Sequence, residues 1–265
     1  MLCAGDRRMK QITSKDNPRY KLLRQLVRST HARREQNRIV LDGVHLVQAY
    51  LAAFGSAGTQ LFVRASAIDH AEVAALAAQA DTVMLSDDLF YRAAPVESPI
   101  GILACAPIPQ VLASHQASFV VLLDGIQDPG NLGAVLRAAA ATGARAAHLS
   151  RSCADPWSPK ALRGGMGAQF VLNLQLHDDL RDAALRLDIP LIAAAVDADT
   201  SLFEADLAQS VGFVIGAEGG GVSPELIALA SQRVRIPMRA GVESLNVASA
   251  AAVIFYEWLR RRQPR

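Results

Sequence analysis

Residues 236–259 read IPMRAGVESLNVASAAAVIFYEWL. An apolar run ends at Pro237, and a polar loop leads from there to Ser244 and Asn246, which are both favoured helix N-cap residues. The residues that follow carry almost no charge before Glu257, which predicts a buried helix. Ligands of parallel α/β domains bind where strand tips lead into such helices, so the polar pair marks a candidate binding site. The alternative is that Ser244 or Asn246 only caps the helix.

Two further segments share this order of apolar strand, Gly-rich polar turn and helix. They are LLDGIQDPGNLGAVLRAAAATGA (residues 122–144) and FVIGAEGGGVSPEL (residues 213–226). Together the three segments resemble the signature motifs of the SPOUT superfamily, specifically those of the SpoU-type (TrmH-like) RNA ribose 2′-O-methyltransferases. The matching positions are Asp128-Pro129-Gly130-Asn131-Leu132-Gly133 with Arg137, then Gly216-Ala217-Glu218-Gly219, then Ile236-Pro237-Met238 with Ser244-Leu245-Asn246-Val247. Three ordered motifs are far more specific than any one of them, and the resemblance covers the chain from Ser118 onward.

The resemblance implies a catalytic site and a cofactor site within these motifs. It implies S-adenosyl-L-methionine as the cofactor, a homodimer formed through the C-terminal domain, and a C-terminal segment threaded as a trefoil knot. The residues that match the family's catalytic positions are Asn131, Arg137, Glu218, Ser244 and Asn246. Those that match its cofactor positions are Gly216, Ile236, Met238 and Leu245.

Arg137 is a single charge in an otherwise apolar stretch of Ala, Val and Leu. A buried arginine needs a partner for its charge, so one alternative is a structural ion pair. A ribose hydroxyl must lose a proton to attack a methyl group, whereas the arginine side chain is effectively always protonated. We therefore expect Arg137 to hold an RNA phosphate or to stabilise the developing alkoxide, rather than to accept the proton.

The glycines of the second motif fall at positions 216, 219, 220 and 221. This spacing differs from the G-x-G-x-x-G of dinucleotide-binding folds, and no acidic residue follows at a later strand tip. We therefore disfavour a dinucleotide site and expect these glycines to let a flat adenosine approach backbone amides. Glu218 is the one charged residue of this turn, and its alternative role is that of a carboxylate beside the next helix.

Charge is distributed unevenly along the chain. Residues 1–38 contain 11 Lys/Arg against three acidic residues, a net +8, and the remaining residues contain 16 against 22, a net −6. A basic arm on a mildly acidic body favours an anionic partner, with RNA first, although a solvated helix face is the alternative. The arginines expected to contact RNA are Arg24, Arg28, Arg33 and Arg34, joined by Arg163 through the resemblance. There the family's usual Arg-Ala-Ser is Arg163-Gly164-Gly165, which removes a hydroxyl.

Two α/β domains are expected. Residues 1–106 resemble the small ribosomal-protein-like domain that binds RNA in many SpoU-type enzymes, with Asp42-Gly43 where the family usually has Glu-Gly. Residues 107–117 predict a linker. Residues 118–265 alternate strands and helices, which predicts a parallel sheet with helices on both faces. The strands are expected at 119–123, 146–149, 170–174, 191–196 and 211–215.

Several classes are excluded by composition. No apolar run approaches the roughly 18–20 residues of a membrane span, and the basic N-terminus lacks an apolar signal core. Three scattered cysteines and six scattered histidines favour neither disulfides nor a metal site. We expect a cytoplasmic protein with residues 1–10 disordered, and Met9 is an alternative start.

These observations predict an S-adenosyl-L-methionine-dependent RNA ribose 2′-O-methyltransferase that acts on structured RNA. A two-domain layout favours ribosomal RNA over transfer RNA. The alternative from another class is an RNA-binding protein that kept the fold and lost catalysis, against which the intact catalytic positions argue.

Overall fold

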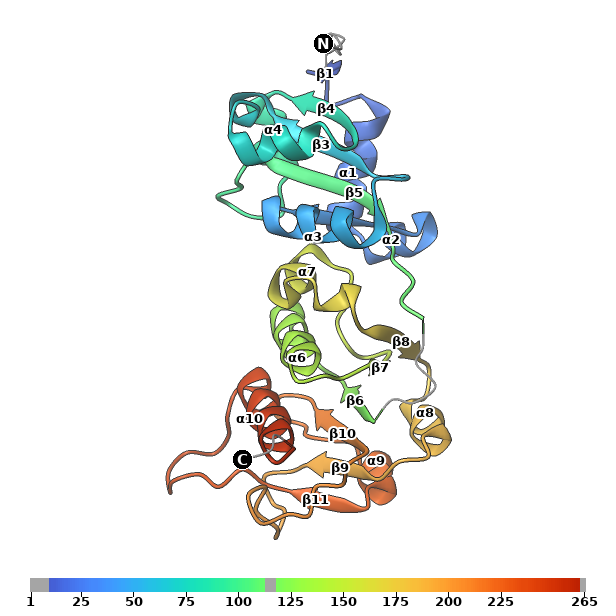
Figure 1. Cartoon of the computed structure of the whole chain (residues 1–265), viewed down its shortest axis with the longest axis vertical. Helices are drawn as coiled ribbons and strands as arrows, with labels where there is room; N and C mark the ends of the chain where they lie inside the picture. Colours follow the sequence, from blue (N-terminus) through green and yellow to red (C-terminus); the bar gives the residue numbers. More distant parts are fainter. Residues whose placement is uncertain (1–9, 113–117, 263–265) are drawn as a thin grey trace. The chain divides into compact units, whose positions relative to one another are not determined.

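The computed structural model describes residues 10–112 and 118–262 of the 265-residue chain (Figure 1). These residues form two compact units, and the chain enters the second unit at Gln110. The expected disorder of residues 1–9, the alternative start at Met9 and part of the expected linker lie outside the described residues. Lys10 was expected to be disordered and instead begins a strand. Within the described residues, no helix combines the length and the apolarity needed to cross a membrane.

The first unit is built on a five-stranded sheet of order β1-β4-β3-β5-β2. The strands are β1 (Lys10–Ile12), β2 (Arg38–Asp42), β3 (Gln60–Arg64), β4 (Asp81–Leu85) and β5 (Ile102–Pro107). β5 is antiparallel to both of its neighbours, and the other pairs are parallel. The helices are α1 (Pro18–Arg28), α2 (Thr30–Gln36), α3 (Val44–Phe54), α4 (Ala71–Ala77) and α5 (Asp87–Ala93), with a 3-10 turn η1 (Ala65–Ala67). Helix α1 starts at Pro18 behind the N-cap Asn17, whose side chain accepts a hydrogen bond from the Arg19 amide at 2.9 Å.

The second unit contains a six-stranded parallel sheet of order β11-β9-β10-β6-β7-β8. Its strands are β6 (Phe119–Asp124), β7 (Ala146–Ser150), β8 (Asn173–His177), β9 (Leu191–Ala194), β10 (Val211–Gly216) and β11 (Gln232–Val234). Its helices are α6 (Pro129–Ala141), α7 (Pro159–Gly165), α8 (Leu180–Arg186), α9 (Pro224–Leu229) and α10 (Val247–Arg260), with a 3-10 turn η2 (Ala168–Phe170). The predicted parallel sheet is confirmed.

Helices cover both faces of this sheet, as its apolar strands predicted. Alternate residues of β6 enter different cores: Phe119 packs with α6 and α10, whereas Val120 packs with α8 and α9. The α10 side is filled by an aromatic cluster in which Phe119 contacts Phe213, Phe255 and Trp258, with ring centroids 4.6–5.8 Å apart. The sheet is therefore held between two separate apolar layers.

Two expectations for this unit were wrong in detail. The strand expected at 170–174 lies at 173–177, because residues 168–170 form a 3-10 turn that follows Gly167 at a positive φ of 93°. The last helix was expected to be buried all round, yet Val253 and Tyr256 lie on its exposed side. Apolar character on every side of a helix therefore does not ensure burial within one chain.

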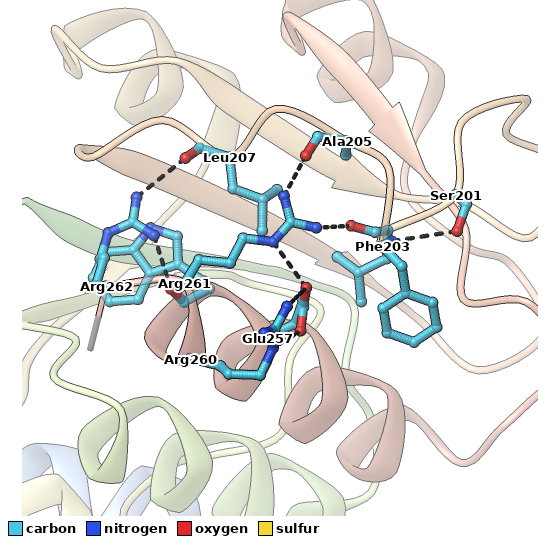
Figure 2. Close-up of polar contacts among 10 residues, drawn as sticks. Ser201, Phe203, Ala205, Leu207, Glu257, Arg260, Arg261 and Arg262 are labelled. Carbon is cyan, nitrogen blue, oxygen red and sulfur yellow. Dashed lines mark hydrogen bonds and ion pairs between the residues drawn. The ribbon is translucent and has the colours of Figure 1, made fainter. Parts of the chain in front are cut away.

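A network that we call the C-terminal clamp fixes the end of α10 to the loop between β9 and β10 (Figure 2). It consists of Glu257, Arg261 and Arg262, together with four carbonyl groups of that loop. Arg261 donates to Glu257 at 2.8 Å and to two of the carbonyls, and the Arg262 guanidinium lies 3.9 Å from the centre of a Trp258 ring. The accepting carbonyls belong to Leu202, Ala205, Leu207 and Ala208. The loop thus has its backbone acceptors satisfied by side chains more than fifty positions later.

Candidate active site

The first two motifs follow neighbouring strands. β6 and β10 pair in parallel and end side by side at Asp124 and Gly216, so the loops that follow them leave the same edge of the sheet. Asp124 joins these loops directly, because its side chain accepts a hydrogen bond from the Ser223 amide at 3.0 Å. This contact could not be predicted from the sequence, in which only the position of the Asp124 carboxylate at a strand tip points to it.

Three predicted catalytic residues, one from each motif, meet at this edge. The side-chain amide of Asn131 donates to Glu218, and that of Asn246 donates to Asn131 at 3.1 Å and more distantly to Glu218 at 3.4 Å. An ionised carboxylate only accepts hydrogen bonds, so Glu218 sets which way both carboxamides point. We call Asn131, Glu218 and Asn246 the motif junction.

Asn246 also caps α10, because its side-chain oxygen accepts hydrogen bonds from the amides of Ala248 at 2.9 Å and Ser249 at 3.3 Å. The capping alternative is therefore correct for Asn246 but incomplete, since the same side chain joins the motif junction through its nitrogen. Ser244 does neither: it is exposed and makes no hydrogen bond within the described residues.

The turn before α6 is fixed by an ion pair that the sequence analysis missed. Asp128 accepts a hydrogen bond from the Asn131 amide at 2.9 Å and contacts the Lys160 ammonium group of α7 at 2.6 Å. The hydrogen bond from Lys160, and then that from the Asn131 amide, lower the pKa of Asp128 below its ordinary value. Lys160 therefore helps to position Asn131.

Arg137 is exposed on α6. Within the described part of the chain it forms no hydrogen bond and no ion pair, so the alternative of a structural salt bridge is wrong. Among the described residues, no hydrogen bond or ion pair joins the Arg137 side chain to the motif junction. An exposed guanidinium without an internal partner remains available to an anionic ligand.

The glycine turn folds back on the end of β10. A Cβ atom at Gly216 would lie 2.0 Å from the Gly221 carbonyl carbon, and Ala217 and Gly221 exchange backbone hydrogen bonds of 3.0 and 2.9 Å. Gly219 and Gly221 adopt positive φ values. The glycines are thus needed for the close backbone contacts of the turn, which positions Glu218 in the motif junction. This arrangement does not fit a dinucleotide-binding turn.

The loop between β11 and α10 suits a ligand with polar edges and apolar faces. Leu245 is 40% exposed, while Ile236 and Met238 are half-buried. Within the described residues, the backbone N–H groups of residues 243–246 donate no hydrogen bond to the chain. Free donors beside exposed apolar side chains are what an adenosine or methionine moiety requires, so these residues fit the expected cofactor.

The arginines predicted to bind RNA differ in their surroundings. Arg28 and Arg34 are exposed, and Arg24 is half-buried, its guanidinium 5.9 Å from the centre of the Tyr20 ring. Arg33 is only 3% exposed and donates to the Leu26 carbonyl at 2.6 Å. It joins α1 to α2, so its inclusion among the RNA-contacting residues was wrong.

Arg163 is exposed on α7, and the two glycines after it have a packing role. A Cβ atom at Gly164 would lie 2.8 Å from the Gly130 carbonyl oxygen, and one at Gly165 would lie 2.2 Å from the Gln169 side chain. Gln169 is fully buried and donates to the Ala161 carbonyl at 3.0 Å. The hydroxyl missing at position 165 is thus replaced by close packing on Gln169, which the sequence analysis missed.

The sequence and fold of this chain are similar to those of known RNA methyltransferases. Residues 118–256 match the model of the SpoU rRNA Methylase family. An uncharacterized tRNA/rRNA methyltransferase of Synechocystis is 34% identical over 95% of this chain and 94% of its own length. The 23S rRNA (guanosine(2553)-2′-O)-methyltransferase RlmP of Bacillus subtilis is 30% identical over 94% of this chain and 98% of its own length. The crystal structure of an RNA 2′-O ribose methyltransferase is 30% identical, covers 95% of this chain and 99% of its own, and superposes with a TM-score of 0.82. The chain therefore belongs to the SpoU rRNA Methylase family.

Proposed function

We propose that this protein transfers a methyl group from S-adenosyl-L-methionine to a ribose 2′-hydroxyl of ribosomal RNA. The observation that carries the proposal is the motif junction, in which the three signature motifs of a methylase family meet through side chains at one sheet edge. Ribosomal RNA is favoured because RlmP, a relative named for 23S rRNA, matches 94% of the chain.

Four residues would hold the cofactor: Gly216, Ile236, Met238 and Leu245. The chemistry supplied when S-adenosyl-L-methionine is bound is an electrophilic methyl group on sulfur. The free amides of residues 243–246 would bind polar edges, and Ser244 would orient the ribose. The hydrogen bonds of the motif junction would hold the loops of all three motifs in fixed positions around that site.

Arg137 would act on the nucleophile. In the overall reaction, the 2′-oxygen bonds to the methyl carbon, the carbon–sulfur bond breaks, and the hydroxyl proton leaves to solvent. Negative charge grows on the oxygen as the proton departs. A guanidinium cannot accept that proton but stabilises the developing charge, and it can also hold a neighbouring phosphate.

We further propose the organisation of the chain around this chemistry. Residues 1–106 would bind RNA, residues 107–117 would link the two domains, and residues 118–265 would form a knotted methyltransferase domain. The exposed apolar residues of α10 and its neighbouring loop, among them Val253, Tyr256 and Phe203, support a homodimer formed through this domain.

The test combines ligand binding with methyl transfer. S-adenosyl-L-methionine, but not NAD, should raise the thermal midpoint of the purified protein, since a ligand that binds the native state stabilises it. Labelled methyl groups should then pass to total RNA, and the product should be a 2′-O-methylated ribose of ribosomal RNA. Stabilisation by NAD alone would overturn the proposal, and binding without transfer would favour an RNA-binding protein that has lost catalysis.

A further inference from the structure

The carboxylate of Asp124 replaces a hydrogen-bond acceptor that the sequence around α9 lacks. Ser223 is the N-cap of α9, and its own side chain makes no capping hydrogen bond. In a capping box, a Glu or Gln three positions after the cap accepts a hydrogen bond from the amide of the cap residue. That position here is Leu226, whose side chain has no acceptor. Asp124, 99 positions earlier in the chain, accepts from the Ser223 amide instead, at 3.0 Å.

Asp124 thereby holds both ends of the glycine-rich turn that carries Glu218. The turn begins at Gly216, which lies opposite Asp124 in the parallel pairing of β10 with β6. It ends at Ser223, whose amide donates to the Asp124 side chain. One residue of the strand before the first motif therefore fixes where the turn of the second motif starts and where it stops.

The tip of β6 is itself held from its other side. The Gly125 amide donates to the Ser150 hydroxyl at the end of β7, at 2.9 Å. The Cys153 thiol, just beyond β7, donates to the Leu123 carbonyl at 3.2 Å. Because the residues on either side of Asp124 are bonded to the β7 side of the sheet, Asp124 is a fixed point for the turn after β10.

The turn has little else to hold its outer part in place. Residues 218–221 are all exposed, and a Cβ atom at Gly219 or Gly221 would meet no atom within 4 Å. Glycine also has more conformational freedom to lose on folding than any other residue. An exposed turn of this composition depends on the contacts at its ends, and the side chain of Asp124 supplies one of them. Its bond is charge-assisted, which makes it about twice as strong as a neutral one.

We propose that Asp124 is a positioning residue for methyl transfer: by fixing the glycine-rich turn, it holds Glu218 where that carboxylate orients the side chains of Asn131 and Asn246. This inference rests on the proposed function and deepens it, because it adds a residue that acts on the motif junction from outside it. The alternative is that Asp124 only caps α9, in which case its loss would lower stability and leave the junction unchanged.

The first experiment separates these two roles by turnover. Asp124→Ala should lower kcat by about 10- to 100-fold, the scale for misplacing a catalytic group by about 1 Å. Asp124→Asn keeps a neutral acceptor and should lower kcat by only about threefold. The matched control is Asp179→Ala, which removes a carboxylate that accepts from the Arg181 amide at 2.8 Å at the start of α8. It should lose similar stability and keep the kcat of the parent protein.

A double variant tests whether Asp124 acts through Glu218. Residues that act through one another have non-additive effects. Asp124→Ala combined with Glu218→Gln should therefore have a kcat close to that of Glu218→Gln alone. Independent losses that multiply in the double variant would show that Asp124 does not work through Glu218.

Hydrogen exchange measures the turn directly and needs no methyl transfer. In Asp124→Ala the amides of Ala217 and Gly221 should exchange roughly tenfold faster through local opening of the turn. The amides of β7 should exchange as in the parent protein, and Asp179→Ala should leave the turn unchanged. If Asp124→Ala does not unfold cooperatively, Asp124→Asn carries the same measurements with smaller effects in the same direction.

The outcomes distinguish this inference from the proposed function. Unchanged exchange of the turn in a folded Asp124→Ala protein would overturn the inference, and so would a kcat equal to that of the parent protein. Equal losses of kcat in Asp124→Ala and Asp179→Ala would also overturn it, because they would reflect stability alone. If the parent protein transfers no methyl group, the proposed function fails, while hydrogen exchange still decides whether Asp124 holds the turn.

Discussion

Replacing Arg137 by alanine should separate folding from catalysis. The side chain is exposed and forms no hydrogen bond or ion pair within the described residues, so its removal leaves no buried partner without a bond. Alanine has a slightly higher helix propensity than arginine, and surface substitutions of this kind change stability by about 0.5 kcal/mol or less. Removing one preorganised donor to a developing oxyanion costs about 100-fold or more in turnover, roughly 2.7 kcal/mol.

The assay measures three quantities on the same preparation: the free energy of unfolding in urea, the affinity for S-adenosyl-L-methionine, and the rate of methyl transfer to ribosomal RNA. The first two should match the parent protein, and the third should fall by at least about 100-fold. Arg137→Lys should recover little, because an ammonium cannot replace a planar two-pronged donor. Arg181→Ala, which removes another exposed helical arginine of the same unit, is the matched control and should retain full turnover.

Near-normal methylation by a folded Arg137→Ala protein would refute the assignment. A loss of stability of roughly 3–5 kcal/mol, the usual cost of breaking a buried ion pair, would instead refute the exposed position that the structure gives this residue.

Three further predictions concern other sites. Asn246→Ala should lower stability by about 1 kcal/mol through the lost cap and abolish turnover, whereas Asn246→Asp should keep the cap, lose the donor to the motif junction and also fail in turnover. Urea unfolding paired with methyl transfer checks both, and an active Asn246→Asp protein would contradict the role of the junction. Charge reversal at the exposed or half-buried positions Arg24, Arg28 and Arg34 should weaken RNA binding and flatten its salt dependence. Arg33→Ala should instead lower the free energy of unfolding by about 1–3 kcal/mol. Similar effects on RNA binding and on stability at all four positions would contradict the burial of Arg33. Hydrogen bonding to Arg260, above all, lowers the pKa of Glu257 from 4.5 to about 2, so this carboxylate stabilises the fold above pH 4.5 and the stabilisation is lost as pH falls toward 2. Glu257→Gln should therefore reduce the acid sensitivity of the thermal midpoint in that range. An unchanged pH profile of the thermal midpoint would count against this role of Glu257.

The motif residues could be predicted from sequence because their chemistry is local. Asn246 has the residue type and position of an N-cap, and Pro129 marks the start of α6, so strand-tip loops and helix starts followed from short segments. The meeting of Asn131 with Asn246, which are 115 positions apart, came from the family resemblance alone. Propensity and spacing carry no information on such distant pairings.

Other features depended on neighbours that no local pattern reveals. Arg33 and Arg34 are adjacent and chemically identical, yet one is buried against α1 carbonyls and the other is exposed. From the sequence, Gly165 indicates only the loss of the family's serine hydroxyl, whereas the position of Gln169 shows that no side chain fits there. In both cases the deciding atoms belong to another element, and only the packing shows them.

The C-terminal clamp has a consequence for the order in which the second unit is assembled. Its hydrogen bonds join residues 54–59 positions apart, so the carbonyls of the loop between β9 and β10 keep water as their partner until α10 has formed and docked. Closing so long a segment is entropically unfavourable early in folding. The loop should therefore be among the last parts of the unit to become protected from hydrogen exchange during refolding, and it stays open while the final helix moves into place beside it.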